Sequence, residues 1–121
     1  SIMPSLTFEI YLPIATVSEA NQREHWAKKA ARAKAQRAQA YLLTFGLRRM
    51  LLPATVRLTR ISPRELDDDN LRGAIKAVRD GIADRLGIND RDPRVKWEYG
   101  QEKGRPKQRG VQVTAATDIP F

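Results

Sequence analysis

The sequence predicts a small α/β (α+β) domain, a single unit over residues 1–121, with a mixed sheet of about four strands and two main helices in the order β-α-β-α-β-β. Two observations carry this prediction. Short stretches alternate apolar and polar residues, which is typical of half-buried strands, and two longer segments have helical periodicity. A chain of 121 residues can bury a core of its own, and no linker or internal repeat divides it.

The first strand and the first helix are indicated by periodicity and by capping residues. Residues 6–12 alternate apolar and polar side chains and predict a strand that ends at Pro13. An alanine-rich, basic helix is predicted over about residues 21–45, with Ser18 as a candidate cap and Gly46 near its end.

The second strand and the second helix follow. A strand is predicted around residues 56–61, closed by Ser62-Pro63. The helix begins at three consecutive aspartates, residues 67–69, which interact favourably with its dipole, and it ends near Gly87. Its apolar positions share one face that should pack on the sheet: Leu71, Ala74, Ile75, Val78, Ile82 and Leu86.

Two further strands complete the predicted sheet. Alternation returns at residues 95–99 and again at residues 111–115. The intervening residues 100–110 are rich in turn formers and in basic side chains. We expect the two strands to pair as a hairpin with a long basic loop at its tip.

The composition excludes several classes of protein. The chain has no cysteine, which removes disulfides, thiol catalysis and zinc sites that need sulfur, and its only histidine is His25. No apolar run approaches the ~20 residues that span a bilayer, and no signal peptide is visible. We therefore expect a cytoplasmic protein that has no membrane partner.

The charges point to a polyanionic partner and are unevenly distributed. Lys and Arg number 22 against 14 Asp and Glu, a net charge of +8. Eight bases and one acid lie within residues 21–50, whereas eight of the fourteen acids lie within residues 65–92. A further basic group follows within residues 103–109. The clustering of carboxylates in one stretch of a basic protein indicates that they have a function.

The aspartate run is the strongest candidate for that function. Adjacent carboxylates repel one another unless solvent or a cation lies between them, and Mg²⁺ prefers oxygen ligands. If the run is extended, Asp67 and Asp69 point to one side and Asp68 to the other. A second acidic pair, Asp90 and Asp92, follows the helix and is expected to return toward the first group.

Lys76 lies on the same helix stripe as Asp69 and could bind a scissile phosphate. Structural explanations exist for each of these residues. An aspartate run can simply cap a helix, Lys76 and Asp80 can form a surface pair at i, i+4, and Asp90 and Asp92 can be turn residues beside Pro93. Spacing alone leaves these alternatives open.

The residues in this order resemble a known signature. The run Asp67-Asp68-Asp69-Asn70-Leu71, then Lys76, Asp80 and the turn Asn89-Asp90-Arg91-Asp92, is similar to the pattern of the RusA family of Holliday junction resolvases, especially its phage and prophage members. The resemblance extends over roughly residues 5–115 and includes Asn21, which opens the first basic segment.

The resemblance implies a homodimeric endonuclease that depends on Mg²⁺, for which Mn²⁺ is expected to substitute, and that makes paired nicks in four-way DNA junctions. It implies metal ligation by Asp67 and Asp69 with a third aspartate, Asp90 or Asp92, of which Asp90 is preferred. Asp68 matches a variable position. Lys76 corresponds to the family lysine but follows the motif at a longer spacing, so Arg72 is an alternative catalytic cation.

Basic and amide side chains are expected to hold the DNA arms through phosphates, with an affinity that falls steeply with salt. The expected DNA contacts are Asn21, Arg23, Lys28, Lys29, Arg32, Asn70, Arg72, Lys103, Arg105 and Lys107. Two other functions remain open: a non-catalytic nucleic-acid-binding protein, and a Mg²⁺-dependent nuclease for other branched DNA.

Overall fold

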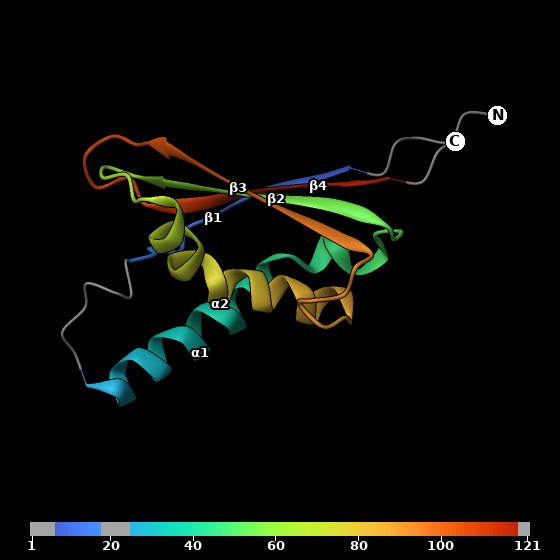
Figure 1. Cartoon of the computed structure of the whole chain (residues 1–121), viewed down its shortest axis with the longest axis horizontal. Coiled ribbons are helices and arrows are strands. Elements are labelled where there is room, and N and C mark those ends of the chain that lie inside the picture. Colours follow the sequence, from blue (N-terminus) through green and yellow to red (C-terminus); the bar gives the residue numbers. More distant parts are fainter. Residues whose placement is uncertain (1–6, 18–24, 119–121) are drawn as a thin grey trace.

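Both α-helices of the described chain lie against the same face of one four-stranded sheet (Figure 1). The computed structural model describes residues 7–17 and 25–118. Its elements, in chain order, are β1 (Thr7–Leu12), α1 (Trp26–Leu43), the short 3-10 helix η2 (Phe45–Arg49), β2 (Ala54–Ser62), α2 (Asp68–Leu86), β3 (Val95–Lys103) and β4 (Gly110–Thr117). This order confirms the predicted arrangement and adds η2.

The sheet is mixed, as predicted, with the strand order β1-β4-β2-β3. β2 and β3 are parallel and are joined through α2, because parallel neighbours need a crossover connection. β4 runs antiparallel to both of its neighbours, β1 and β2. The crossover places the start of α2 just after the end of β2, and the end of α2 just before the start of β3.

The predicted hairpin between the last two strands is wrong, because β2 lies between β3 and β4. The connecting loop instead crosses the end of β2, where Gly104 N donates a hydrogen bond to Ser62 O at 2.9 Å. Crossing one strand requires a span of roughly 10 Å, which a loop of this length covers easily. Alternation indicates that a segment is a strand, but it does not indicate which strand lies beside it.

Local capping explains the limits of α2. Asp67 is extended and its side chain accepts a hydrogen bond from Asn70 N at 2.9 Å, so it is the N-cap. The helix ends at Gly87, which has a φ of 72° in the left-handed region that glycine adopts without strain. Both ends agree with the sequence prediction.

The start of α1 differs in part from the prediction. The described helix begins after His25, whose Nδ1 accepts a hydrogen bond from Ala27 N at 3.1 Å. His25 is therefore a cap, which gives it a structural role. The expected cap Ser18 and the expected start at residue 21 lie outside the described residues.

The first helix ends two residues before its predicted end near residue 45. α1 ends at Leu43, its C-cap is Thr44, whose Oγ1 donates to Ala40 O at 2.6 Å, and the chain continues directly into η2. A Cβ on Gly46 would meet the ring of Phe8. This glycine allows η2 to pack closely on β1, and it does not cap the helix.

The core lies between the sheet and the helices. β2 and β4 supply alternate buried side chains, including Val56, Leu58 and Val113, and α2 supplies Ile75 and Val78. The predicted apolar face of α2 is confirmed: five of its six residues are buried and Leu86 packs against the same cluster. Neither helix of the described chain has the length and apolarity that a membrane span requires.

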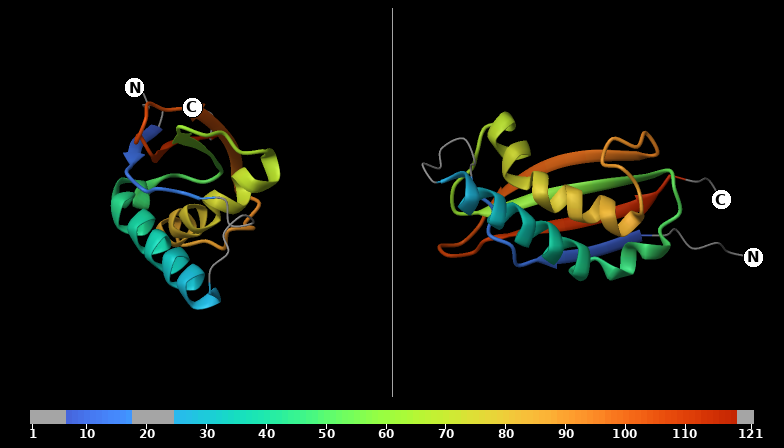
Figure 2. Two further views of the ribbon diagram at one scale, coloured as in Figure 1. Left: turned by 90° about the vertical axis from the view of Figure 1, so that its left-hand side faces the viewer. Right: turned by 90° about the horizontal axis from the view of Figure 1, so that it is seen from below.

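Three segments that are far apart in the sequence lie at the same end of the molecule: the start of α1, the start of α2 and the loop between β3 and β4 (Figures 1 and 2). Gln101 on β3 fixes one of these relations, because its amide binds both Leu66 N, at 2.9 Å, and Leu66 O, at 2.6 Å. The aspartate run thus begins beside the end of β3. The fold brings the acidic run and two basic segments to one end.

Candidate metal and nucleic-acid site

The aspartate run opens α2 and is exposed. Asp67 is the N-cap, and Asp68 and Asp69 are the first residues of the helix. Only Asp67 has the extended conformation from which the same-side arrangement of Asp67 and Asp69 was expected. Within residues 7–17 and 25–118, none of the three carboxylates forms an ion pair.

The surroundings of the run are favourable for negative charge. The free backbone N–H groups at a helix N-terminus carry partial positive charge, which stabilises Asp68 and Asp69 in the first turn of α2. Arg72 lies one turn beyond Asp69, is exposed, and has its guanidinium 5.4 Å from the centroid of the Tyr99 ring. These positive groups would attract a substrate phosphate, whereas a cation would be attracted by the three carboxylates.

Lys76 lies farther along α2 and is bound by two carboxylates. Its Nζ donates to Asp80 at 2.6 Å and to Asp90 at 3.1 Å. Partial burial opposes the charge on Lys76, but the two carboxylates outweigh it and hold the pKa of Lys76 above its ordinary value. The same contact, from the other side, lowers the pKa of Asp90.

Arg79 fixes the turn that carries Asp90. Its guanidinium donates to Asp90 O at 2.6 Å and to the Tyr99 hydroxyl at 2.6 Å, and it lies 4.8 Å from the centroid of the Trp97 ring. These contacts join α2, the turn and β3. Nothing in the sequence pattern singled out Arg79, because its partners come from a strand whose position beside α2 is set by the fold.

The other acids after the first turn of α2 are also paired. Asp84 binds Arg37 of α1 at 2.6 Å, and this hydrogen bond lowers the pKa of Asp84. Asp92 binds the side chain and the backbone N–H of Arg94, which lowers the pKa of Asp92 to about 2. The two candidate third ligands therefore have different partners. Asp90 binds Lys76 on α2, whereas Asp92 binds Arg94 in the residues just before β3.

The two groups of carboxylates stay apart. Lys76 lies about two turns, or roughly 10 Å along the helix axis, beyond Asp69. Asp90 contacts α2 at Lys76 and not at the aspartate run. Within the described chain, no three His, Cys, Asp or Glu side chains lie close enough together to hold a metal ion. Mg²⁺, however, commonly uses one or two carboxylates, with water and substrate phosphate as its other ligands. The exposed pair Asp67 and Asp69 fits this pattern of donors.

The predicted DNA contacts divide between α1 and the loop that follows β3. Lys28 and Lys29 are exposed on α1, and Arg32 is partly buried there. Lys103 ends β3, and Arg105 and Lys107 lie exposed in the loop. Asn70 lies in the first turn of α2. Asn21 and Arg23 lie outside the described residues.

Two pockets follow the α1–α2 contact. One, of about 310 Å³, is polar and lies over the paired acids, with Arg37, Lys76, Asp80, Asp84 and Asp90 among its lining residues. The other, of about 170 Å³, lies nearer the helix starts. Lys29, Ala33, Gln36, Gly73, Ala74, Lys76, Ala77 and Asp80 line it. The second pocket connects the basic face of α1 with the side of α2 that carries the aspartate run.

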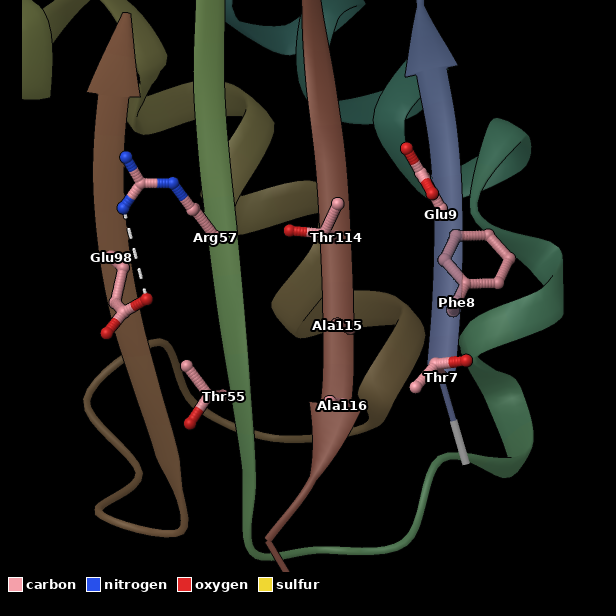
Figure 3. Close-up of a pocket in the computed structure, with 9 residues that line it drawn as sticks. All are labelled: Thr7, Phe8, Glu9, Thr55, Arg57, Glu98, Thr114, Ala115 and Ala116. Atoms are coloured by element: carbon pink, nitrogen blue, oxygen red, sulfur yellow. Dashed lines mark ion pairs between the residues drawn. The ribbon is translucent and has the colours of Figure 1, made fainter. Parts of the chain in front are cut away.

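A third pocket, of about 280 Å³, lies on the sheet face opposite the helices (Figure 3). Thr7, Thr55, Thr114 and Ala116 give it a floor of small side chains. Of its charged lining residues, Glu98 lies 4.0 Å from Arg57 and Glu9 accepts a hydrogen bond from Gln112. This pocket gathers no pair of free carboxylates, so it is a weaker candidate than the start of α2.

Comparison with known proteins adds little about function. No protein-family model matches the chain. A protein of Xylella fastidiosa (strain Temecula1 / ATCC 700964), described as an uncharacterized protein, is 38% identical over 82 residues, which is 59% of this chain and 52% of the relative. The chain therefore spans about half the length of this curated relative.

Proposed function

We propose that the protein is a Mg²⁺-dependent, structure-selective endodeoxyribonuclease of the kind that the RusA resemblance implies, acting on four-way DNA junctions. The observation that carries the proposal is a contrast in charge pairing. In a chain of net charge +8, the acids of α2 beyond its first turn bind cations, yet Asp67, Asp68 and Asp69 have no ion pair within the described chain. Unpaired carboxylates at one point of a basic protein favour an external cation.

In this proposal Asp67 and Asp69 hold the metal and Asp68 is dispensable. The two carboxylates would hold a Mg²⁺ ion, which when bound would supply a water of lowered pKa and neutralise charge on the phosphate. The carboxylates orient the site, and the helix N-terminus lowers the cost of bringing an anionic phosphate to it. Asp90, the third ligand that the resemblance implies, binds Lys76 at 3.1 Å, about two turns of α2 beyond Asp69. The proposal therefore places the metal on Asp67 and Asp69, with water and substrate phosphate as its other ligands.

Two cations are candidates for stabilising charge that develops on the phosphate. Arg72 lies one turn from Asp69 and has no carboxylate partner within the described residues. Lys76 lies farther from the run and is bound by Asp80 and Asp90. Proximity and free charge therefore favour Arg72, and the sequence resemblance favours Lys76.

The basic segments would bind the DNA backbone. The start of α1, which carries Lys28 and Lys29, and the loop with Arg105 and Lys107 lie at the same end of the molecule as the start of α2, which supports phosphate contacts near the aspartate run (Figure 1). Paired nicks need two sites related by symmetry, so the proposal includes a homodimer with a two-fold axis.

The experiment that tests this function compares a synthetic four-way junction with a flap and a linear duplex of the same length, with Mg²⁺, with Mn²⁺ and with chelator. We expect metal-dependent cutting of the junction well above that of the other substrates. Equal rates on all three would exclude a resolvase. Junction binding without cutting at any metal concentration would instead support a non-catalytic binding protein.

A further inference from the structure

We propose that Trp26 stacks on an unpaired nucleobase and that the exposed start of α1 thereby selects branched over fully paired DNA. This inference rests on the proposed function, since it names what that site recognises. We call the segment of Trp26, Lys28 and Lys29 the α1 tip. The proposal requires only base binding by the tip, so it is testable without cleavage.

Trp26 is far more exposed than its chemistry favours. Its side chain is 74% accessible, the highest exposure among the large hydrophobic residues of the described chain. Large aromatic side chains are normally at least partly buried, because burial of their apolar area is favourable. The neighbouring ring of His25, with its centroid 5.4 Å away, packs beside Trp26 and leaves most of the indole uncovered.

The uncovered position follows from the geometry of the helices. Trp26 lies on the same helical face as Ala33 and Ala40, which face α2 farther along α1. α1 and α2 run side by side but diverge toward their starts (Figures 1 and 2). The face that α2 covers at Ala40 is therefore open at Trp26, and the pocket of about 170 Å³ between the helices begins at Lys29 and Gly73.

The charge around Trp26 identifies the class of partner. The first turn of α1 contains no acid, and Lys28 and Lys29 are both exposed there; Lys29, three residues after Trp26, lies on the same helical face. An exposed aromatic ring next to basic side chains is the arrangement by which proteins hold single-stranded nucleic acid, with base stacking on the ring and phosphate contacts from the cations. A continuous duplex stacks both faces of every base, whereas opening of the pairs that flank a branch point frees a base face for the indole.

The location of the α1 tip also supports base binding near the aspartate run. The α1 tip lies at the same end of the molecule as the start of α2, and Gly73, where no atom would meet an added Cβ within 4 Å, leaves the space between them open. A strand whose base stacks on Trp26 would run along this space toward Asp69. Base stacking at the tip would thus set which phosphate reaches the aspartate run.

Indole fluorescence tests the proposal directly, because the chain has two tryptophans and the other, Trp97, is half-buried beneath Arg79. The protein is titrated, in chelator so that nothing is cut, with a duplex that carries unpaired thymines, with the same duplex carrying abasic sites at those positions, and with a fully paired duplex. Trp26→Phe, which keeps Trp97 as the only indole, is the matched control.

We expect quenching by the unpaired thymines, little by the abasic duplex, and none in Trp26→Phe. Trp26→Ala should weaken binding to unpaired thymines by about five- to a hundredfold, while Trp26→Phe keeps most of the affinity and binding to the paired duplex is unchanged. Equal weakening for all three DNAs would overturn the proposal.

Binding of the α1 tip to a partner other than DNA would give a different result and would contradict the proposal. Quenching by vesicles of phosphatidylglycerol but not by DNA would assign the tip to an anionic membrane surface. Quenching that depends on protein concentration alone would assign it to a second copy of the chain. If the protein shows base-dependent quenching but cuts no DNA with any metal ion, base binding by Trp26 is supported and the proposed nuclease activity is excluded.

Discussion

The acids at the start of α2 and the acids along the rest of it differ in what neutralises them. Asp80 and Asp90 share Lys76, and Asp84 binds Arg37, so each of these carboxylates has a cation within 3.1 Å. Among the described residues, the run 67–69 has only the helix N-terminus to neutralise it. In a protein with an excess of cations, carboxylates left without one are available for a ligand, whereas the paired ones hold α2 to its neighbours.

The comparison also separates two roles that look alike in the sequence. Both sets consist of aspartates in or next to one helix, and the resemblance draws metal ligands from both, Asp67 and Asp69 from one and Asp90 from the other. The structure gives the distal set a structural account, since its partners come from α1 and from the turn before β3. The proximal set has a structural role as well, since Asp67 caps α2, but no cation of the described chain neutralises it.

The largest expected effect is on cleavage by variants of the run. Asp69→Asn and Asp67→Asn should lower the rate of junction cutting by about 10²–10³-fold, because each loses a charged metal ligand worth several kcal/mol. Asn caps a helix as well as Asp does, so Asp67→Asn should leave the melting temperature unchanged. Single-turnover cleavage and thermal melting measure the two.

Matched controls for that prediction are Asp68→Asn, in the same run, and Asp84→Asn, in the paired set. Both should cut at nearly the normal rate and bind junctions normally. If Asp84→Asn lost as much activity as Asp69→Asn, the division between the two sets of acids would be wrong.

The next effect distinguishes the two cations. Arg72→Gln should slow cutting by about 10²-fold, as expected for removal of a group that stabilises charge in the transition state, and Lys76→Gln should slow it less. The measurement is kcat and KM, determined separately for both variants on the same junction. A larger loss of kcat in Lys76→Gln would show that the lysine leaves its two carboxylates during the reaction.

A third prediction concerns how tightly α2 is held at each position. A Cβ on Gly81 would meet the backbone of α1 at Arg37, so Gly81→Ala should cost about 1–3 kcal/mol of unfolding free energy. A Cβ on Gly73 meets nothing, and Gly73→Ala should stabilise the helix by about 0.5–1 kcal/mol. Urea denaturation of the two variants measures this contrast, and similar shifts would contradict it.

The smallest effect is a pH dependence of stability from the paired acids. Arg94 lowers the pKa of Asp92 from 3.8 to about 2. Because the folded pKa is depressed, this pair stabilises the fold above about pH 4, and the contribution is lost as the pH falls toward 2. The stability difference between the protein and Asp92→Asn should therefore shrink over that interval in acid denaturation curves. A constant difference would exclude the pair as its source.

The sequence predicted the local parts of this structure well. The apolar stripe of α2, its aspartate start and its glycine end all follow from helical periodicity and capping, and all are confirmed. The order of strands and helices along the chain was also predictable. These features depend on residues within a few positions of one another, where periodicity carries the information.

Features that depend on distant neighbours were not predictable. The hairpin of β3 and β4 was wrong because β2 inserts between them. The link from Arg79 to Asp90, and the pairing of Asp84 with Arg37, need partners that only the packed fold brings together. The same packing leaves Trp26 uncovered, although nothing in its own segment distinguishes it from a buried residue.

The central claim is that the carboxylates of Asp67 and Asp69, and not the paired acids, are where the metal binds. Mn²⁺ added to the ¹⁵N-labelled protein broadens amide signals near its binding site, and this locates the metal directly. The account predicts that signals of residues 66–71 are lost first and that Asp69→Asn abolishes the effect. Broadening centred on residues 80–92 with residues 66–71 still sharp, or no selective broadening at all, would contradict it.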